Sequence, residues 1–161
     1  IVMSLEGIPA FYIHSMLATP NDIDAVERRG MNRAINRHRW DYPTLKARLA
    51  DPDSNQSRVL AALSGRLRIR ARQPAFHPNA TQFTLMLDER VFGLWRQSLE
   101  RDQSIFALHN VSGQPVTIAM EDLNLIADEP WTDLLSGETV QPDQTAVQLA
   151  PYQCRWITNR P

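Results

Sequence analysis

The sequence is poor in the residues that build several common kinds of site. Its single cysteine, Cys154, cannot form an internal disulfide bond, so we expect a buried structural thiol and a reducing, cytoplasmic compartment. Its six glycines stand singly and build no phosphate-binding loop. Its four histidines share no metal-ligand spacing with cysteine or acidic residues, so we expect no metal and no cofactor.

Membranes and nucleic acids are poor candidates for partners. Residues 1–18 are apolar, but Glu6 and Pro9 interrupt them and no basic segment precedes them, which argues against a secretion signal and a membrane span. The net charge of −1 provides no general attraction for polyanions or anionic lipids. A hydrophobic content of 43% and a charged content of 22% are typical of a globular protein with a packed core.

The chain changes character at Gln73-Pro74. The first 74 residues hold 12 Lys or Arg against 7 Asp or Glu, whereas the remainder holds 5 against 11. The stretch before this point predicts a doubly buried strand, a capped turn and two helices. The strand is predicted over residues 4–14, and Asn21 or Asp22 is the N-cap at the turn. The first helix covers residues 43–52, and the second begins at Ser54 or Ser57. We therefore divide the chain into residues 1–73 and 74–161.

The second part predicts an antiparallel β-sandwich. Its polar and apolar residues alternate in short segments, which turn residues separate at intervals of about ten positions. The strand-forming segments are residues 81–98, 104–120, 131–138 and 145–157. At strand spacing a tryptophan is usually a core residue, and we expect this of Trp95, Trp131 and Trp156. For His77 and His109 we likewise expect structural roles.

Residues 30–40, GMNRAINRHRW, concentrate hydrogen-bonding side chains in a segment without a regular period, which predicts a loop. The segment holds three arginines, two asparagines and a histidine. A nucleic-acid patch, a solvated surface and a site for a small oxygen-rich ligand are the three interpretations. Acidic residues on both sides argue against nucleic acid. A guanidinium group binds two oxygens at once, which suits a sugar diol, a carboxylate or a phosphate.

Two segments before the boundary, GIPAFYIHSMLATPND and GMNRAINRHRW, and two after it, WTDLLSG and LAPYQCRWI, form a recognisable combination. The first two resemble the last barrel strand, and the loop that follows it, in the sucrose phosphorylase-like branch of the α-amylase superfamily. The other two resemble the closing strands of the C-terminal β-domain of these enzymes. The resemblance implies an α+β fragment: residues 1–73 supply the final strand and helices of a β/α barrel, and residues 74–161 form the antiparallel β-sandwich.

The resemblance also implies a function. Members of the family retain configuration at glucose, because a carboxylate nucleophile forms a glucosyl-enzyme that phosphate then intercepts. Their nucleophile and acid/base lie on earlier barrel strands, so we expect no catalytic residue in this chain and no activity of the chain alone. Arg37 is expected to bind glucose. The other expected substrate-binding residues are Asn36, His38, Arg33 and His14.

Several expectations about partners follow from the same resemblance. The parent enzyme would bind a sugar, use inorganic phosphate as co-substrate, and phosphorolyse sucrose or a related α-glucoside. A hydrolase of the same superfamily and a non-catalytic structural or carbohydrate-contacting module are the alternatives. The apolar start at Ile1 reads as the beginning of a C-terminal piece. An unpaired barrel strand exposes its edges, so residues 1–15 are expected to pair with a second copy or with the sandwich, or else to be disordered.

Overall fold

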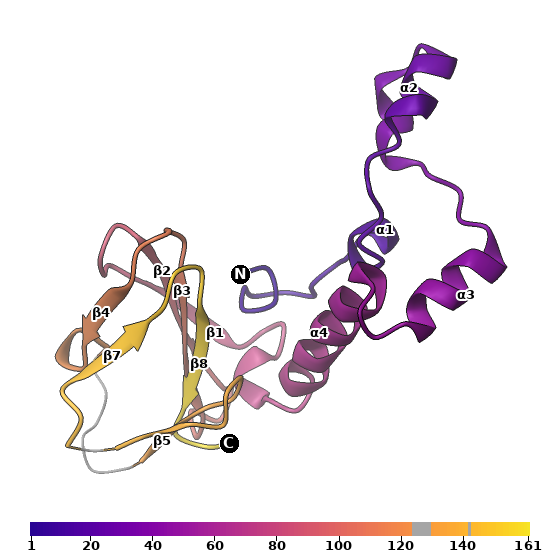
Figure 1. The fold of residues 1–161 in the computed structure, drawn as a ribbon. Coiled ribbons are helices and arrows are strands. Elements are labelled where there is room, and N and C mark those ends of the chain that lie inside the picture. Colours follow the sequence, from indigo (N-terminus) through magenta and orange to yellow (C-terminus); the bar gives the residue numbers. More distant parts are fainter. Residues whose placement is uncertain (124–129, 142) are drawn as a thin grey trace. The chain divides into compact units, whose positions relative to one another are not determined.

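The computed structural model describes residues 1–123, 130–141 and 143–161, and the chain divides into two compact units (Figure 1). The sheet unit comprises Ile1–Pro9 together with Arg68–Pro161, and the helical unit comprises Ala10–Leu67. Within these described ranges, four α-helices and antiparallel sheets make this an α+β chain. The first nine residues thus group with the sheets rather than with the helices. The domain boundary after residue 73 stays a prediction.

The helical unit begins its helices at the residues that local chemistry favours. Its elements are α1 (Ile13–Met16), α2 (Ile23–Arg29), the 3-10 helix η1 (Asn32–Asn36), α3 (Tyr42–Ala50) and most of α4 (Asn55–Arg70). The Asp22 carboxylate accepts a hydrogen bond from the Ala25 N–H at 2.9 Å, and the Ser54 hydroxyl accepts one from the Ser57 N–H at 3.1 Å. Both caps satisfy backbone donors that a helix start leaves free. The predicted caps Asp22 and Ser54 are confirmed.

The prediction of a strand over residues 4–14 is wrong. The backbone of the first seven residues forms turns and bends, with the Ser4 N–H donating to the Ile1 carbonyl at 2.8 Å, and the chain then enters α1 at Ile13. A barrel strand exchanges backbone hydrogen bonds with neighbouring strands on both sides, and the described residues before β1 (Thr81–Leu85) contain no strand. The apolar run over residues 4–14 was therefore not sufficient evidence for a strand.

Two buried arginines hold the N-terminal segment against the sheet unit. Arg96 is fully buried, and its guanidinium donates to the carbonyls of Ser4 at 3.1 Å and His77 at 3.0 Å. Arg70 donates to the Gly7 carbonyl at 2.9 Å. Carbonyl oxygens that water cannot reach are satisfied in this way. Of the alternatives for the start of the chain, the one realised for residues 1–9 is packing against the sheet unit.

The sheet unit is an antiparallel sandwich, as predicted. The larger sheet has the strand order β1-β2-β3-β8-β5-β6, and the smaller sheet pairs β4 with β7. Its short helices are η2 (Pro74–Phe76) and η3 (Glu121–Leu123). Its strands are β1 (Thr81–Leu85), β2 (Val91–Gln97), β3 (Ser104–Asn110), β4 (Val116–Ala119), β5 (Trp131–Asp133), β6 (Thr139–Val140), β7 (Ala146–Leu149) and β8 (Cys154–Thr158).

The core of the sandwich consists of side chains from both sheets. Phe106 and Ile157 from the larger sheet join Ile118 and Val147 from the smaller one, and all four are buried. Alternation along each strand places these residues on the inner faces. Trp131 and Trp156 are buried and Trp95 packs against the core partly buried, as expected for core tryptophans. Within the described residues, every helix is too short or too polar to span a membrane.

His109 on β3 is a buried histidine in its neutral form. It is 2% exposed, and its Nε2 atom lies 2.9 Å from the Ser4 hydroxyl oxygen. Burial and, to a smaller extent, the positive charge of the chain's N-terminus together lower the pKa of His109 to about 3. The unfolded chain binds a proton on this histidine at about pH 6.5, so between these two values the unfolded state holds more protons than the folded state.

The free energy of unfolding should therefore fall as the pH drops from about 6.5 toward 3, by up to roughly 1.4 kcal/mol per pH unit from His109 alone. Urea unfolding of wild type and His109→Gln at pH 7, 6, 5 and 4.5 measures this dependence. In His109→Gln the free energy of unfolding should fall less steeply with decreasing pH than in wild type. The matched control His77→Gln, at an exposed histidine, should show the wild-type pH dependence. Equal slopes in wild type and His109→Gln would show that His109 accepts a proton in the folded state.

Candidate functional site

The residues predicted to bind substrate all lie in the helical unit, on α1, on η1 and directly after η1. His14 lies on α1, Arg33 and Asn36 lie on η1, and Arg37 and His38 follow it directly. The predicted loop over residues 30–40 is thus partly a 3-10 helix. Two hydrogen bonds and a ring contact connect the two histidines through Thr19 and Trp40, neither of which was predicted to belong to the site.

Thr19 is the first of these connecting residues. The Trp40 indole N–H donates to the Thr19 hydroxyl at 2.9 Å, and the His14 Nδ1 atom lies 3.1 Å from the same oxygen. The Trp40 ring also meets the His38 ring edge to face, with centroids 4.9 Å apart. One hydroxyl therefore links the α1 histidine to the segment that carries His38.

Asp22 serves the helix and the loop at once. One carboxylate oxygen caps α2, and the other lies 3.4 Å from the His38 Nδ1 atom. The hydrogen bond from the Ala25 N–H lowers the pKa of the Asp22 carboxyl, and His38 and Arg28 contribute in the same direction. The group is therefore a carboxylate at neutral pH and accepts hydrogen bonds only.

The backbone of η1 is fixed from two sides. The Asp22 N–H donates to the Ile35 carbonyl at 2.8 Å, and the Tyr12 hydroxyl donates to the Asn36 carbonyl at 2.9 Å. Ala34, 2% exposed, is the buried residue of the turn. Two hydrogen bonds and the buried Ala34 therefore hold this 3-10 turn, so the side chains on its outer face point in a defined direction.

The polar side chains on this turn are free to meet a ligand. Arg33, Asn36 and Arg37 are exposed. Within the described residues, neither guanidinium has a hydrogen-bond or ion-pair partner. The structure thus brings His14 and His38 into one network and leaves Arg33 and Arg37 outside it. An unpaired guanidinium on a fixed turn can bind two oxygens of one ligand.

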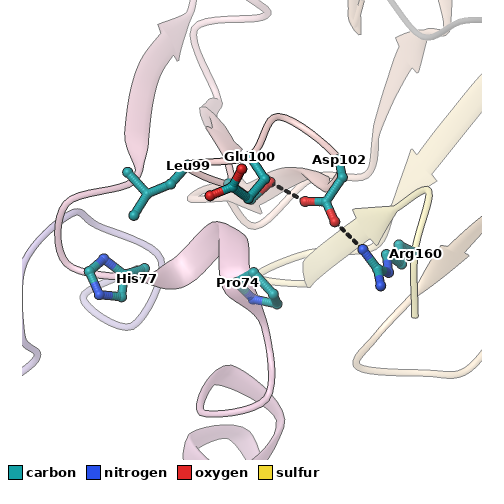
Figure 2. A pocket seen from close by; sticks show the side chains of 7 residues that line it. Pro74, His77, Leu99, Glu100, Asp102 and Arg160 are labelled. Atoms are coloured by element: carbon teal, nitrogen blue, oxygen red, sulfur yellow. Dashed lines mark hydrogen bonds and ion pairs between the residues drawn. The ribbon is translucent and has the colours of Figure 1, made fainter.

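A hollow in the sheet unit is the other candidate for a binding site (Figure 2). Its volume is about 330 Å³, and it lies between η2, the β2–β3 connection and the chain end. Figure 2 shows Asp102 paired with Arg160 at its rim. No residue predicted to bind substrate lines it, and within the described part of the chain no three His, Cys, Asp or Glu side chains are grouped to hold a metal.

Comparison with known proteins shows which enzymes this chain is similar to. The chain is 38% identical over 157 residues to a glucosylglycerate phosphorylase of Allomeiothermus silvanus and 33% identical over 166 residues to one of Spirochaeta thermophila. Each alignment covers 98% of this chain but only 25% and 28% of the relative. The chain thus spans about a quarter of the length of these curated relatives. No family model matches the chain.

The solved structures agree on the fold. An α-amylase from Geobacillus thermoleovorans in complex with acarbose matches with a TM-score of 0.73 and 16% identity, over 99% of this chain and 31% of the enzyme. AmyP in complex with maltose matches with a TM-score of 0.56 over 67% of this chain. The resemblance to a phosphorylase of the α-amylase superfamily is confirmed. The relatives are named for glucosylglycerate, so the prediction of a sucrose phosphorylase-like branch was narrower than these findings support.

Proposed function

We propose that this chain is the substrate-contacting part of a glycoside phosphorylase, which cleaves an α-glucoside with phosphate and releases α-glucose 1-phosphate. The names of the relatives support phosphorolysis, and they favour glucosylglycerate over sucrose as the glucosyl donor. Inorganic phosphate is the co-substrate, and the reaction takes place without a metal or a further cofactor. We place the enzyme in the cytoplasm.

The proposed reaction proceeds in two displacements at the anomeric carbon. A carboxylate attacks this carbon while an acid protonates the departing glycosidic oxygen, so the rest of the α-glucoside leaves with a hydroxyl group. An oxygen of hydrogen phosphate then attacks the same carbon, breaks the ester bond and gives its proton back to the deprotonated acid. This step restores the carboxylate, the acid and the original configuration. The carboxylate and the acid belong to the rest of the barrel, outside these 161 residues. The isolated chain is therefore inactive.

The chain contributes the residues that hold the sugar. Arg37 binds hydroxyl oxygens of the glucosyl group, and the support for this role is its exposed, unpaired guanidinium on a turn fixed by Tyr12 and Asp22. Arg33 contacts the sugar or the phosphate. Asn36 and His38 orient the turn or contact the sugar, and His14 contacts it from α1. Hydrogen bonds that tighten as charge develops on the glucosyl group lower the barrier.

The two units of the chain correspond to two parts of the parent enzyme. The helices of the first 73 residues complete the β/α barrel, whose active sites lie at the ends of its strands. The antiparallel sandwich is the domain that follows the barrel. The match to an α-amylase over 99% of this chain supports the assignment, although the barrel strand expected at residues 4–14 is not formed here.

A substrate comparison with the full-length protein tests this function. Glucosylglycerate and sucrose are each incubated with and without phosphate, and glucose 1-phosphate and free glucose are measured. We expect glucose 1-phosphate from glucosylglycerate, with little free glucose and no turnover when phosphate is left out. Release of free glucose at the same rate with and without phosphate would identify a hydrolase, and no turnover in any mixture would remove the assignment.

A further inference from the structure

Each of the two histidines of the candidate site has a hydrogen-bond partner at its Nδ1 atom, and the two partners are a hydroxyl group and a carboxylate. The Nδ1 atom of His14 faces the Thr19 hydroxyl at 3.1 Å, and the Nδ1 atom of His38 faces the Asp22 carboxylate at 3.4 Å. The Nε2 atom of each ring has no hydrogen-bond partner within the described part of the chain. A neutral imidazole donates from one nitrogen and accepts at the other, so the partner at Nδ1 determines what Nε2 offers.

Thr19 supplies a donor to His14. The Trp40 indole N–H is a donor only, so the Thr19 oxygen must accept from it at 2.9 Å. The Thr19 oxygen has a second lone pair and can also accept from His14 Nδ1, but its own proton would then have no acceptor among the described residues. Donation from the Thr19 hydroxyl to His14 Nδ1 instead gives each polar hydrogen of this contact a partner within the chain. In this arrangement the ring proton of neutral His14 sits on Nε2, which makes Nε2 a donor toward a ligand.

Asp22 supplies an acceptor to His38. An ionised carboxylate accepts hydrogen bonds only, so the proton of the contact must belong to His38 Nδ1. In neutral His38 the Nε2 atom consequently carries a lone pair and accepts a hydrogen bond. The Asp22 carboxylate is itself fixed by capping α2, so it cannot turn away without loss of the Ala25 hydrogen bond.

We propose that Thr19 and Asp22 are positioning residues that hold neutral His14 and His38 in opposite tautomers. The site then presents one N–H donor and one nitrogen acceptor. A sugar hydroxyl group both donates and accepts, so it can accept from His14 Nε2 or donate to His38 Nε2. The identity of the ligand as a sugar rests on the proposed function, whereas the tautomers follow from the contacts of the chain itself.

Nitrogen-15 NMR of the uniformly labelled 161-residue chain at pH 8 reads the tautomers directly. Long-range proton–nitrogen correlations distinguish a protonated ring nitrogen from an unprotonated one, and histidine-to-glutamine variants assign the four rings. We expect an unprotonated Nδ1 in His14 and a protonated Nδ1 in His38. The same tautomer in both rings, or the two tautomers exchanged, overturns the proposal.

Three variants test the partners themselves. Thr19→Val keeps the shape but removes the hydroxyl, so His14 should become a mixture of tautomers, whereas Thr19→Ser should retain the wild-type signal. Asp22→Asn keeps an oxygen for the cap and offers an N–H to His38, so the His38 tautomer should reverse. Circular dichroism confirms that each variant is folded. Wild-type tautomers in both Thr19→Val and Asp22→Asn would contradict the proposal.

Activity separates this inference from the proposed function. Opposite tautomers in a protein whose full-length form does not catalyse phosphorolysis would support the positioning roles and remove the proposed reaction. Phosphorolysis by a protein in which the two tautomers are identical would support the reaction and overturn the positioning roles.

Discussion

Replacing Arg37 by alanine in the full-length protein is expected to lower kcat/KM for phosphorolysis by about 100- to 1,000-fold. The guanidinium has no partner within the described residues, so its removal leaves no unpaired charge in the chain and should not disturb the fold. The loss should therefore come from the hydrogen bonds to the glucosyl group. Initial rates of glucose 1-phosphate release at several donor concentrations give kcat and KM separately.

A matched control removes an arginine of the same unit that the proposed site does not use. Arg29 is exposed in the last turn of α2, so Arg29→Ala should retain nearly wild-type activity. Arg37→Lys keeps the charge but not the two-oxygen fork, and we expect it to recover only a small part of the lost activity. If Arg37→Ala and Arg29→Ala both retained wild-type activity, Arg37 would belong to a solvated surface and not to the sugar site.

Replacing Asp133 by alanine is expected to destabilise the sheet unit by about 3 to 5 kcal/mol. Asp133 is 1% exposed, and its carboxylate accepts hydrogen bonds from Arg155 Nε at 3.0 Å and from the Trp156 N–H at 3.0 Å. It also binds the turn after β5 through Ser136. Truncation leaves Arg155 Nε and the buried Trp156 N–H without an acceptor, and within the described residues the guanidinium keeps only the exposed Glu138 carboxylate at 3.1 Å. This costs more than the loss of an exposed pair.

Urea unfolding at neutral pH measures this destabilisation. The control is Asp102→Ala, which removes an exposed partner of Arg160 and should change the stability little. Asp133→Asn keeps one acceptor oxygen, so its free energy of unfolding should lie between those of wild type and Asp133→Ala. Similar midpoints for Asp133→Ala and Asp102→Ala would show that the buried pair does not hold β5 to β8.

Elements that depend on local sequence were predicted well. Asp22 and Ser54 cap helices because their short side chains reach backbone donors within three residues. The strand pair around the turn at residues 88–90 follows from alternation and a turn of three polar residues. The failed strand at residues 4–14 depends on neighbours that an apolar run does not specify, and buried Arg96 binds a carbonyl of this segment instead.

The candidate site was predicted in part. The unusual composition of residues 30–40 indicated the segment, and its match to a family pattern selected Arg37. Thr19 and Trp40 were missed because they meet across 21 residues of sequence, and neither belongs to a periodic pattern. The helix cap at Asp22 was visible in the sequence, but its second contact with His38 is a tertiary contact and had no local signal.

A crystal structure of the full-length protein with α-glucose 1-phosphate bound tests the central claim most directly. We expect the Arg37 guanidinium within about 3 Å of a glucose hydroxyl oxygen, with the Nε2 atoms of His14 and His38 facing the ligand. A bound glucosyl group remote from residues 30–40, with Arg37 exposed to solvent, would contradict it. In that case the chain would contribute only scaffold to the enzyme.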